Sequence, residues 1–545
     1  MPINTNRRKN MLDLMRTPDG VKIICDGDAG VMPAAFLAEG RWNSGSGDAE
    51  ARFELGDGLK VFITAKESRP QFLVLRWEHV FDAPAQVLCD AWERNYGTLS
   101  WQGLSGERFL PWYFAIKSEE HIFCGGVKVR PNAFVSFECD ARGITGWFDV
   151  RCGGVGVDLR GRELEVATVV SKDYGKDCSF GAVKDFCKIM CGDGIFPEKP
   201  VYGGNNWYYA YGNSSGEEIR EDAKLIASLA EGLKNRPFMV IDDGWQVKNC
   251  AGPWEPNDKY EDMAKVAEDM KKIGVRPGIW VRLLHDSEVE KAHPEWLLAA
   301  NQYGEKHLDP SIPEVLEYAA ENVRKFVGWG YELIKHDYTT FDIFGDYGHT
   351  LNGSITTRSG WSFKDKTKTS AEIILELYRT IKDAAGDAVI IGCNTVSHLC
   401  AGLVQVNRVG DDTSGKYWCR TRVLGVNSLA FRMPQNHIFY EIDADCVGIL
   451  DKNIPWELNS QWLHLLAKSG TPLFVSCQNG ALDEKQTEEM KKRFAEAAEQ
   501  KDVAIPLDWE YNTTPEIWEI NGEKTRFDWE MGQFPALLRG RAQPI

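Results

Sequence analysis

Two short segments each place a carboxylate just beyond an apolar run, with a cation close before it. Asp337 has Lys335 two residues before it, and Asp412 has Arg408 four residues before it. The apolar runs, residues 331–334 and 403–406, are typical of short buried strands. Two carboxylates delivered from two parallel strands suit the cleavage of a glycosidic bond, because one attacks the anomeric carbon and the other protonates the departing oxygen.

The neighbours of these carboxylates indicate how each would be charged. Residues two apart on a strand face the same side, so Lys335 should keep Asp337 ionised, as a nucleophile requires. Asp411 and Asp412 are adjacent, so one of them should have a raised pKa, which suits a general acid. The alternatives are a structural ion pair at Asp337 and a helix N-cap at Asp412 or Thr413.

A second acidic pair, Asp242 and Asp243, ends another apolar run at residues 238–241. Adjacent carboxylates suit bidentate hydrogen bonds to sugar hydroxyls, and a divalent cation is the competing ligand. No further cluster of His and carboxylates at ligand spacing accompanies the pair, so we expect no metal and no cofactor. Trp280, in the run 277–281, suits stacking on a sugar ring or packing in a core.

Composition narrows the class of protein. The chain has 545 residues and a net charge of −17, which argues against binding to nucleic acid or to an anionic membrane. No apolar stretch reaches the roughly eighteen residues of a membrane span. The basic residues Arg7, Arg8 and Lys9 precede no apolar segment of a secretory signal, and the 14 Cys are scattered as reduced thiols would be. We therefore expect a cytoplasmic protein.

Residues 20–195 are rich in short runs of alternating polarity, separated by turn residues. This pattern predicts an antiparallel β-sandwich. The predicted strands include residues 52–55, 60–64, 72–77, 127–130, 134–137 and 164–170. A helix at about residues 182–190 should lead out of the sandwich.

After Pro200, eight apolar runs alternate with amphipathic helices, which predicts a (β/α)8 TIM barrel. The runs begin near residues 202, 238, 277, 333, 389, 404, 438 and 472, and the clearest helices are predicted at residues 217–230, 260–273, 314–327 and 371–385. A polar helix at residues 484–499 and a short β-rich cap should end the chain. The expected domains are a sandwich (1–195), a catalytic barrel (196–482) and a C-terminal helix with its cap (483–545).

Seven segments, in matching order, resemble the melibiase-type α-galactosidases, a group that includes the raffinose-synthase-like proteins. They are residues 240–245, 276–280, 293–296, 308–310, 334–337, 391–393 and 408–413. The resemblance covers about residues 200–480, and a preceding β-sandwich matches the family's layout. It implies a retaining α-glycosidase that acts on a small or oligosaccharide α-galactoside without a cofactor.

The resemblance also implies a role for each candidate residue. Asp337 matches the family's nucleophile, and Asp412 matches its acid/base. Asp242 and Asp243 match the pair that holds the 4- and 6-hydroxyls of the sugar. The remaining matches, which bind or line the same sugar subsite, are Lys335, Arg408, Trp280, Cys393 and Trp207.

Two departures from the family pattern bear on specificity. Asn394 and Thr395 follow Cys393 where the family commonly has Gly, in a segment that borders the sugar's 2-position. Arg282 is a cation two residues past Trp280, where a neutral residue is expected. It would either meet an anionic substrate group or pair with an acidic neighbour.

The sequence leaves several alternatives open. The glycone could instead be an α-N-acetylgalactosaminide, a β-L-arabinopyranoside or another α-glycoside. The same residues also serve transglycosylation, since only the acceptor differs. From another class, the chain could be a catalytically silent carbohydrate-binding barrel. A homo-oligomer is compatible with the sequence.

Overall fold

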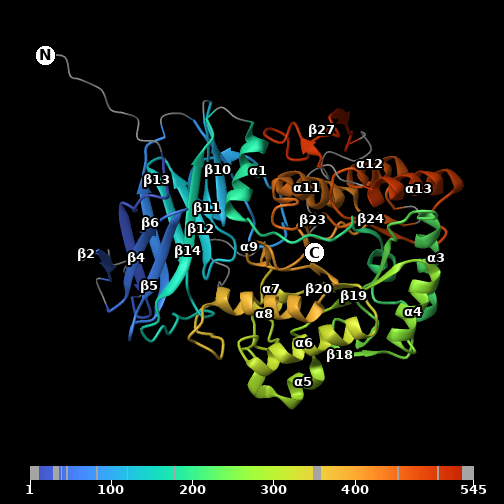
Figure 1. Ribbon diagram of the computed structural model, residues 1–545, viewed down its shortest axis with the longest axis horizontal. Helices are drawn as coiled ribbons and strands as arrows, with labels where there is room; N and C mark the ends of the chain where they lie inside the picture. The colour runs from blue at the N-terminus through green and yellow to red at the C-terminus, as the bar shows by residue number, and fades with distance from the viewer. Residues whose placement is uncertain are drawn as a thin grey trace.

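The computed structural model describes residues 12–28, 36–38, 40–44, 47–81, 84–119, 121–175, 178–347, 358–450, 453–499 and 503–530. An all-β part, blue to cyan in Figure 1, lies beside an α/β part formed by the rest of the chain. Arg7, Arg8 and Lys9 lie outside the described residues. Within these ranges, no helix is both long and apolar enough to cross a membrane.

The N-terminal part is a sandwich of two antiparallel sheets, as the sequence predicts. One sheet has the order β1 (Gly20–Cys25), β6 (Pro70–Glu78), β13 (Gly143–Asp149), β12 (Phe134–Asp140) and β9 (Ser105–Pro111). The other has the order β2 (Phe36–Ala38), β3 (Arg41–Asn43), β4 (Glu50–Leu55), β5 (Leu59–Thr64), β14 (Leu164–Asp173), β11 (Ile122–Val127), β10 (Tyr113–Lys117), β7 (Gln86–Cys89) and β8 (Gln102–Gly103). Alternate residues of β1 are buried, the pattern of a sheet with one face on the core.

The strand expected at residues 127–130 is wrong. β11 ends at Val127, and the chain then turns at Arg130, whose φ is 58°. The sequence did not predict β11 because Gly125 and Gly126 within it are typical of a turn. A Cβ at Gly126 would lie 2.5 Å from the Cβ of Tyr113, so this glycine permits the close approach of β10. The other predicted strands fall within β4, β5, β6, β12 and β14.

The second part is a (β/α)8 barrel, as predicted. Its parallel strand segments are β15 (Tyr202–Asn205), β16 (Phe238–Ile241), β19 (Arg276–Val281), β20 (Leu333–His336), β21 (Val389–Gly392), β22 (Val406–Arg408), β23 (Glu441–Asp443), β24 (Cys446–Ile449) and β25 (Leu473–Cys477). β23 pairs with β22, β24 pairs with β25, and β25 pairs with β15. β23 and β24 are therefore two halves of the seventh strand, broken near Asp445 (φ 74°), and together they close the barrel.

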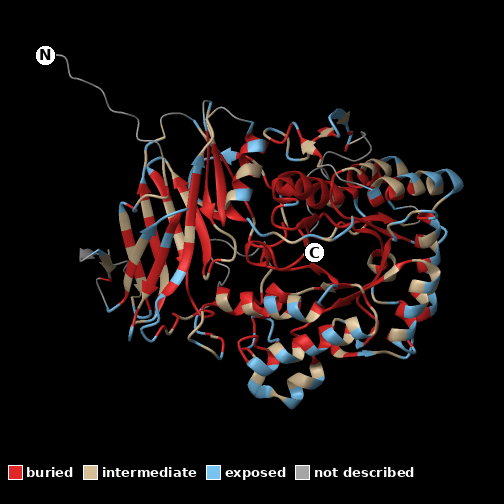
Figure 2. Ribbon diagram, in the orientation of Figure 1, coloured by how far each residue is buried: buried red, intermediate tan, exposed pale blue. Residues whose placement is uncertain are grey.

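Helices cover the outside of the barrel (Figure 1). The four predicted from the sequence are α3 (Gly216–Leu229), α4 (Met263–Ile273), α6 (Pro313–Gly328) and α8 (Ser370–Ala385). α4 begins three residues later than predicted because Asp262 caps it, accepting from the amides of Ala264 and Lys265. The apolar faces of these helices are buried against the strands, and their outer faces are exposed (Figure 2).

Two further helices, α12 (Trp456–Ala467) and α13 (Glu484–Glu499), also pack on the outside of the barrel. α1 (Ser179–Met190) leads out of the sandwich. The shorter helices are α2 (Trp207–Ala210), α5 (Ser287–Ala292), α7 (Thr339–Phe344), α9 (Ser397–Cys400), α10 (Trp418–Arg420) and α11 (Asn427–Arg432), with a hairpin of β17 (Gln246–Lys248) and β18 (Ala251–Pro256). The expected C-terminal cap is a three-stranded antiparallel sheet of β26 (Ile505–Pro506), β27 (Ile517–Ile520) and β28 (Glu523–Arg526). The three-domain boundaries stay a prediction.

A sandwich loop contacts the chain that leaves barrel strand β22. Residues 90–99, called here the 90–99 segment, connect β7 to β8. The amide of Asn95 donates to the carbonyl of Val409 at 2.7 Å, and the amide of Asp411 donates to the carbonyl of Asn95 at 2.9 Å. This short parallel bridge fixes the chain that leaves β22 against the sandwich.

Candidate active site

A cavity opens at the C-terminal ends of the barrel strands, where barrel enzymes carry their active sites. The empty space at this mouth, open solvent included, is about 490 Å³. The lining is polar and aromatic: Arg94, Asn205, Trp207, Tyr208, Asp242, Asp243, Cys250, Trp280, Lys335, Asp337, Tyr338, Asp412 and Asp445. The cavity thus brings together seven of the nine residues that the sequence nominates.

Asp337 directly follows β20. The indole N–H of Trp280 donates to its Oδ2 at 3.1 Å, and the amide of Tyr338 donates to its Oδ1 at 2.8 Å. Burial opposes ionisation, but the charges of Arg94 and then Lys335 outweigh it and lower the pKa of Asp337 below its ordinary value. Asp337 is therefore an oriented, ionised carboxylate, as the sequence suggested, although Arg94 was not foreseen.

Asp412 lies in the loop after β22, with its side chain 37% exposed. Its Oδ1 accepts from Arg408 Nη2 at 3.0 Å and from Arg94 Nη1 at 3.3 Å. Burial alone would raise the pKa of Asp412, but these two guanidinium groups lower it below its ordinary value. The raised pKa expected for a ready general acid is therefore wrong for Asp412 in the free cavity.

The neighbouring Asp411 has a different environment. Its side chain is only 9% exposed and forms ion pairs with Arg420 at 3.0 Å and Arg94 at 3.6 Å. Among the described residues, it is Asp412 and not Asp411 that lines the cavity. The alternative helix cap does not occur, since the next helix in the described chain, α10, has Tyr417 as its N-cap residue.

Asp242 is held by contacts that stay within the barrel. Its Oδ2 accepts from Asn205 Nδ2 at 2.7 Å and from Lys335 Nζ at 2.8 Å. Burial would lower the pKa of Lys335, but Asp242, Cys393 and Asp337 outweigh it and raise that pKa above its ordinary value. Lys335 therefore stays protonated, with its ammonium group paired with Asp242 and close to Asp337.

Asp243 is held by the hairpin that follows it. Its Oδ1 accepts from Gln246 Nε2 at 2.6 Å and from the amide of Cys250 at 2.8 Å. Burial raises the pKa of Asp243 above its ordinary value, against the effect of these hydrogen bonds. Within the described residues, Asp242 and Asp243 belong to no His, Cys, Asp and Glu group spaced to bind a metal ion.

The two nominated tryptophans differ in burial. Trp280 is 2% exposed and packs edge-on against Trp254 and Tyr338, so it is a core residue that also holds Asp337. Trp207 opens α2 and is partly buried, and its amide donates to Asn205 Oδ1 at 2.8 Å. Both contribute to the wall of the cavity.

Cys393 and Arg408 stand one layer behind the cavity wall, as far as the described residues define that wall. Cys393 Sγ lies 3.5 Å from Arg94 Nη1. Arg408 forms ion pairs with Asp412 at 3.0 Å and with Asp445 at 2.6 Å. In the free cavity, these two candidates touch residues of the cavity wall.

The two residues that depart from the family pattern, Arg282 and Asn394, each contact neighbouring side chains. Arg282 pairs with the buried Asp342 at 2.6 Å, which is the acidic-neighbour interpretation. Asn394 has a φ of 55° and donates through Nδ2 to Tyr96 Oη at 2.5 Å and to Glu93 Oε1 at 3.2 Å. Its side chain therefore contacts the 90–99 segment.

Arg94 is the main residue that the sequence did not indicate. It comes from the sandwich yet contacts Asp412, 318 positions away in the chain, and its side chain is 9% exposed. Asn205, Tyr208, Cys250, Tyr338 and Asp445 were likewise not assigned to the site. The strand-end pattern does place Asn205 and Asp445 at the barrel mouth, without a role, but no local pattern marks a loop residue of the sandwich.

A scan against protein-family models finds no match, and no curated protein matches the sequence. The fold, however, resembles that of solved enzymes. The α-galactosidase TtGalA from Thermus thermophilus, in complex with p-nitrophenyl α-D-galactopyranoside, shares 16% identity over 89% of this chain and 98% of its own, with a TM-score of 0.59. The GH36 α-galactosidase AgaA from Geobacillus stearothermophilus shares 16% identity over 85% of this chain and 70% of its own, with a TM-score of 0.57.

A more distant neighbour broadens the comparison. A GH31 sulfoquinovosidase from E. rectale shares 10% identity over 93% of this chain and 86% of its own, with a TM-score of 0.54. At these identities the likeness establishes the fold. The chain has the fold of an α-galactosidase-like glycoside hydrolase, a (β/α)8 barrel behind an N-terminal β-sandwich.

Proposed function

We propose that this protein is a retaining α-glycosidase that hydrolyses terminal α-galactosides through a covalent glycosyl–aspartate intermediate. The observation that carries the proposal is one cavity at the barrel mouth, lined by Asp337 from β20, Asp412 from the loop after β22, and the acidic pair Asp242 and Asp243. Two of these groups suit the chemistry, and two suit the recognition of sugar hydroxyls.

In the first step Asp337 attacks the anomeric carbon. A bond forms between a carboxylate oxygen and that carbon, while the bond to the leaving oxygen breaks and Asp412 gives that oxygen a proton. The lowered pKa of Asp337 keeps it nucleophilic, and the hydrogen bonds from Trp280 and the Tyr338 amide hold its plane.

In the second step Asp412 takes a proton from water, and that water attacks the anomeric carbon and releases Asp337. The retaining mechanism requires a separation of about 5–5.5 Å between the two carboxyl groups. Because Arg94 and Arg408 lower the pKa of Asp412, its acid form is a minority at neutral pH. We therefore expect the activity to be highest at acidic pH.

The acidic pair supports a galacto-configured glycone. Buried carboxylates accept charge-assisted hydrogen bonds from hydroxyls, and an epimer that leaves them unpaired is strongly disfavoured. Asp242 and Asp243 are both buried and line the cavity, where Lys335 pairs with Asp242. The galactoside ligands named for the structural neighbours support an axial 4-hydroxyl at this position.

A panel of p-nitrophenyl glycosides tests the proposal: α-galactoside, α-N-acetylgalactosaminide, α-glucoside and β-L-arabinopyranoside. We expect the highest kcat/KM on the α-galactoside, with retention of configuration in the first product seen by NMR. Preference for the α-glucoside would contradict the galacto assignment alone. No turnover on any member would contradict the enzyme assignment and favour a carbohydrate-binding barrel.

A further inference from the structure

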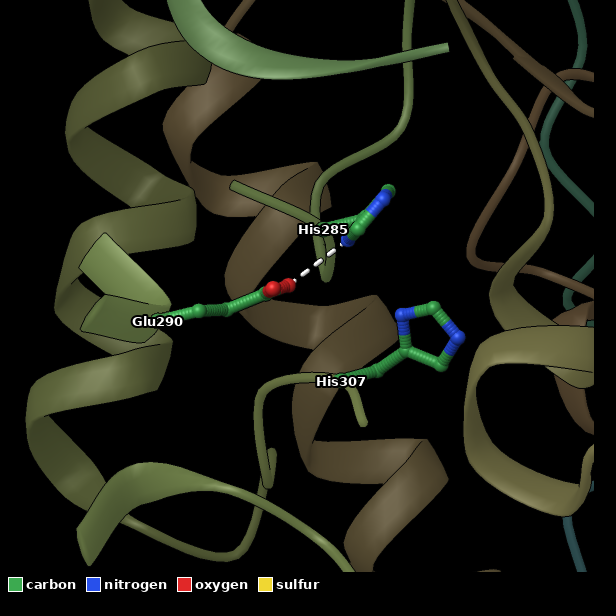
Figure 3. Close-up of side chains that lie close together, drawn as sticks. All are labelled: His285, Glu290 and His307. Carbon is green, nitrogen blue, oxygen red and sulfur yellow. Dashed lines mark hydrogen bonds and ion pairs between the residues drawn. The ribbon is translucent and has the colours of Figure 1, made fainter. Parts of the chain in front are cut away.

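Three potential metal ligands converge outside the active-site cavity. His285 lies in the loop after β19, Glu290 lies in α5, and His307 lies in the loop before α6. One ligand atom of each lies within 4.8 Å of the others, and His285 Nδ1 is 2.6 Å from Glu290 Oε1. Figure 3 shows the His285 and Glu290 side chains, joined by a dashed line, next to the His307 ring.

His307 is the unusual member of this group. It is 2% exposed, and neither ring nitrogen has a hydrogen-bond partner within the described part of the chain. One of these nitrogens faces His285 and Glu290 (Figure 3). A buried polar group without a hydrogen bond is costly, so an imidazole in this state calls for a ligand.

The surrounding charges suit a divalent cation. His307 Nε2 lies 3.7 Å from Glu305 and 3.8 Å from Asp342, and metal-bound histidines usually turn their second nitrogen toward a carboxylate. Asp342 is also paired with Arg282. Glu290, Glu305 and Asp342 against this one guanidinium leave two negative charges, which a divalent ion would neutralise.

We propose that His285, Glu290 and His307 bind a divalent transition-metal ion. Two imidazoles with one carboxylate favour Zn²⁺, which takes such ligands at about 2.0–2.2 Å, and water supplies the fourth ligand. The ion would join the loop after β19, α5 and the loop before α6. Its role would be structural, because no ligand of the site belongs to the described cavity wall.

The test is metal binding to the full-length protein after removal of metals with a chelator. We expect one Zn²⁺ per chain by calorimetry and elemental analysis, a higher Tm with Zn²⁺, and visible d–d bands with Co²⁺. The variants His285→Gln and Glu290→Gln change partly exposed residues, and each should weaken binding at least about tenfold. His307→Asn should abolish Zn²⁺ binding. Because His307 is buried, circular dichroism must first show that this variant folds.

The matched control is His293→Gln. His293 also contacts a glutamate, Glu295, at 3.1 Å, but it is exposed and outside the group of three. This variant should bind Zn²⁺ as the wild type does and keep the rise in Tm. Wild-type protein that binds no Zn²⁺, equal affinity in His285→Gln and Glu290→Gln, or the strong near-ultraviolet thiolate bands of a Co²⁺–cysteine site would overturn the proposal.

Discussion

The two sides of the cavity are built differently. On the barrel side, Asp242 is held by Asn205 and Lys335, so both contacts join the ends of barrel strands. On the sandwich side, Asp412 depends on Arg94, and its loop is bridged to Asn95. One side is completed by the barrel itself, and the other is completed only when the two domains meet.

This difference separates two tasks. Under the proposed function, the barrel side offers fixed acceptors for sugar hydroxyls, and the sandwich side sets the charge of the acid/base residue. Arg94 is the largest electrostatic contribution that lowers the pKa of both Asp412 and Asp337. The proposal therefore assigns the proton chemistry to the contact between sandwich and barrel, and recognition to the barrel.

The largest effect should come from Asp337→Ala, which removes the carboxylate that Arg94 of the sandwich and Lys335 of the barrel keep ionised. Turnover should fall by several orders of magnitude because the covalent step is lost. Azide should restore part of the activity and give the β-glycosyl azide, since a small anion attacks from the vacated face. Activity within tenfold of wild type would contradict the assignment, and circular dichroism would control for folding.

Asp412→Ala should lower turnover by about 10²–10⁴-fold on substrates with poor leaving groups. The loss should be smaller on activated aryl glycosides, whose leaving groups need little protonation. Asp411→Ala is the matched control, because it removes the adjacent carboxylate, which pairs with Arg420. If Asp411→Ala shows the leaving-group dependence and Asp412→Ala does not, Asp411 is the acid/base residue.

On the barrel side, Asp243→Asn should lower kcat/KM for the α-galactoside by about 10–100-fold, the value of a hydrogen bond to a charged group. The preference for α-galactoside over α-glucoside should collapse in parallel, while the anomer cleaved stays the same. The measurement is the ratio of the two kcat/KM values in wild type and variant. An unchanged ratio would mean that Asp243 does not read the 4-hydroxyl.

On the sandwich side, Arg94→Gln should shift the pH profile of kcat/KM. Removing the guanidinium raises the pKa of the nucleophile, which must be ionised, and of the acid, which must be protonated. Both limbs should therefore move to higher pH, by about one unit. Arg108→Gln is the control, since Arg108 contacts β7 in the sandwich rather than the described cavity wall. A profile that does not move would contradict the role of Arg94.

The same contrast explains what the sequence could predict. Strand ends are local patterns, so the barrel, its strands and the residues Asp242, Lys335 and Asp337 follow from hydrophobic runs and their polar ends. β11 was not predicted, because its close packing against β10 requires glycines, and adjacent glycines in a sequence usually indicate a turn. The chain break at Asp445, which lets the seventh strand close the barrel, also has no simple sequence signal.

Arg94 and the pKa of Asp412 could not be predicted for a related reason. Both depend on the contact between Arg94 and Asp412, which are 318 positions apart, and no periodic pattern in the sequence indicates that contact. The predicted raised pKa rests on the acidic neighbour, Asp411. In the structure, Arg420 pairs with that neighbour, and two guanidinium groups face Asp412.

The most direct test of the central claim is to trap the glycosyl–enzyme. The wild-type protein would be incubated with an activated fluorinated α-galactosyl fluoride, digested, and examined by mass spectrometry. We predict one added fluoroglycosyl group on the peptide that contains Asp337, and none in Asp337→Ala. A label on Asp412 or Asp411, or turnover with inversion of configuration and no label, would contradict the account.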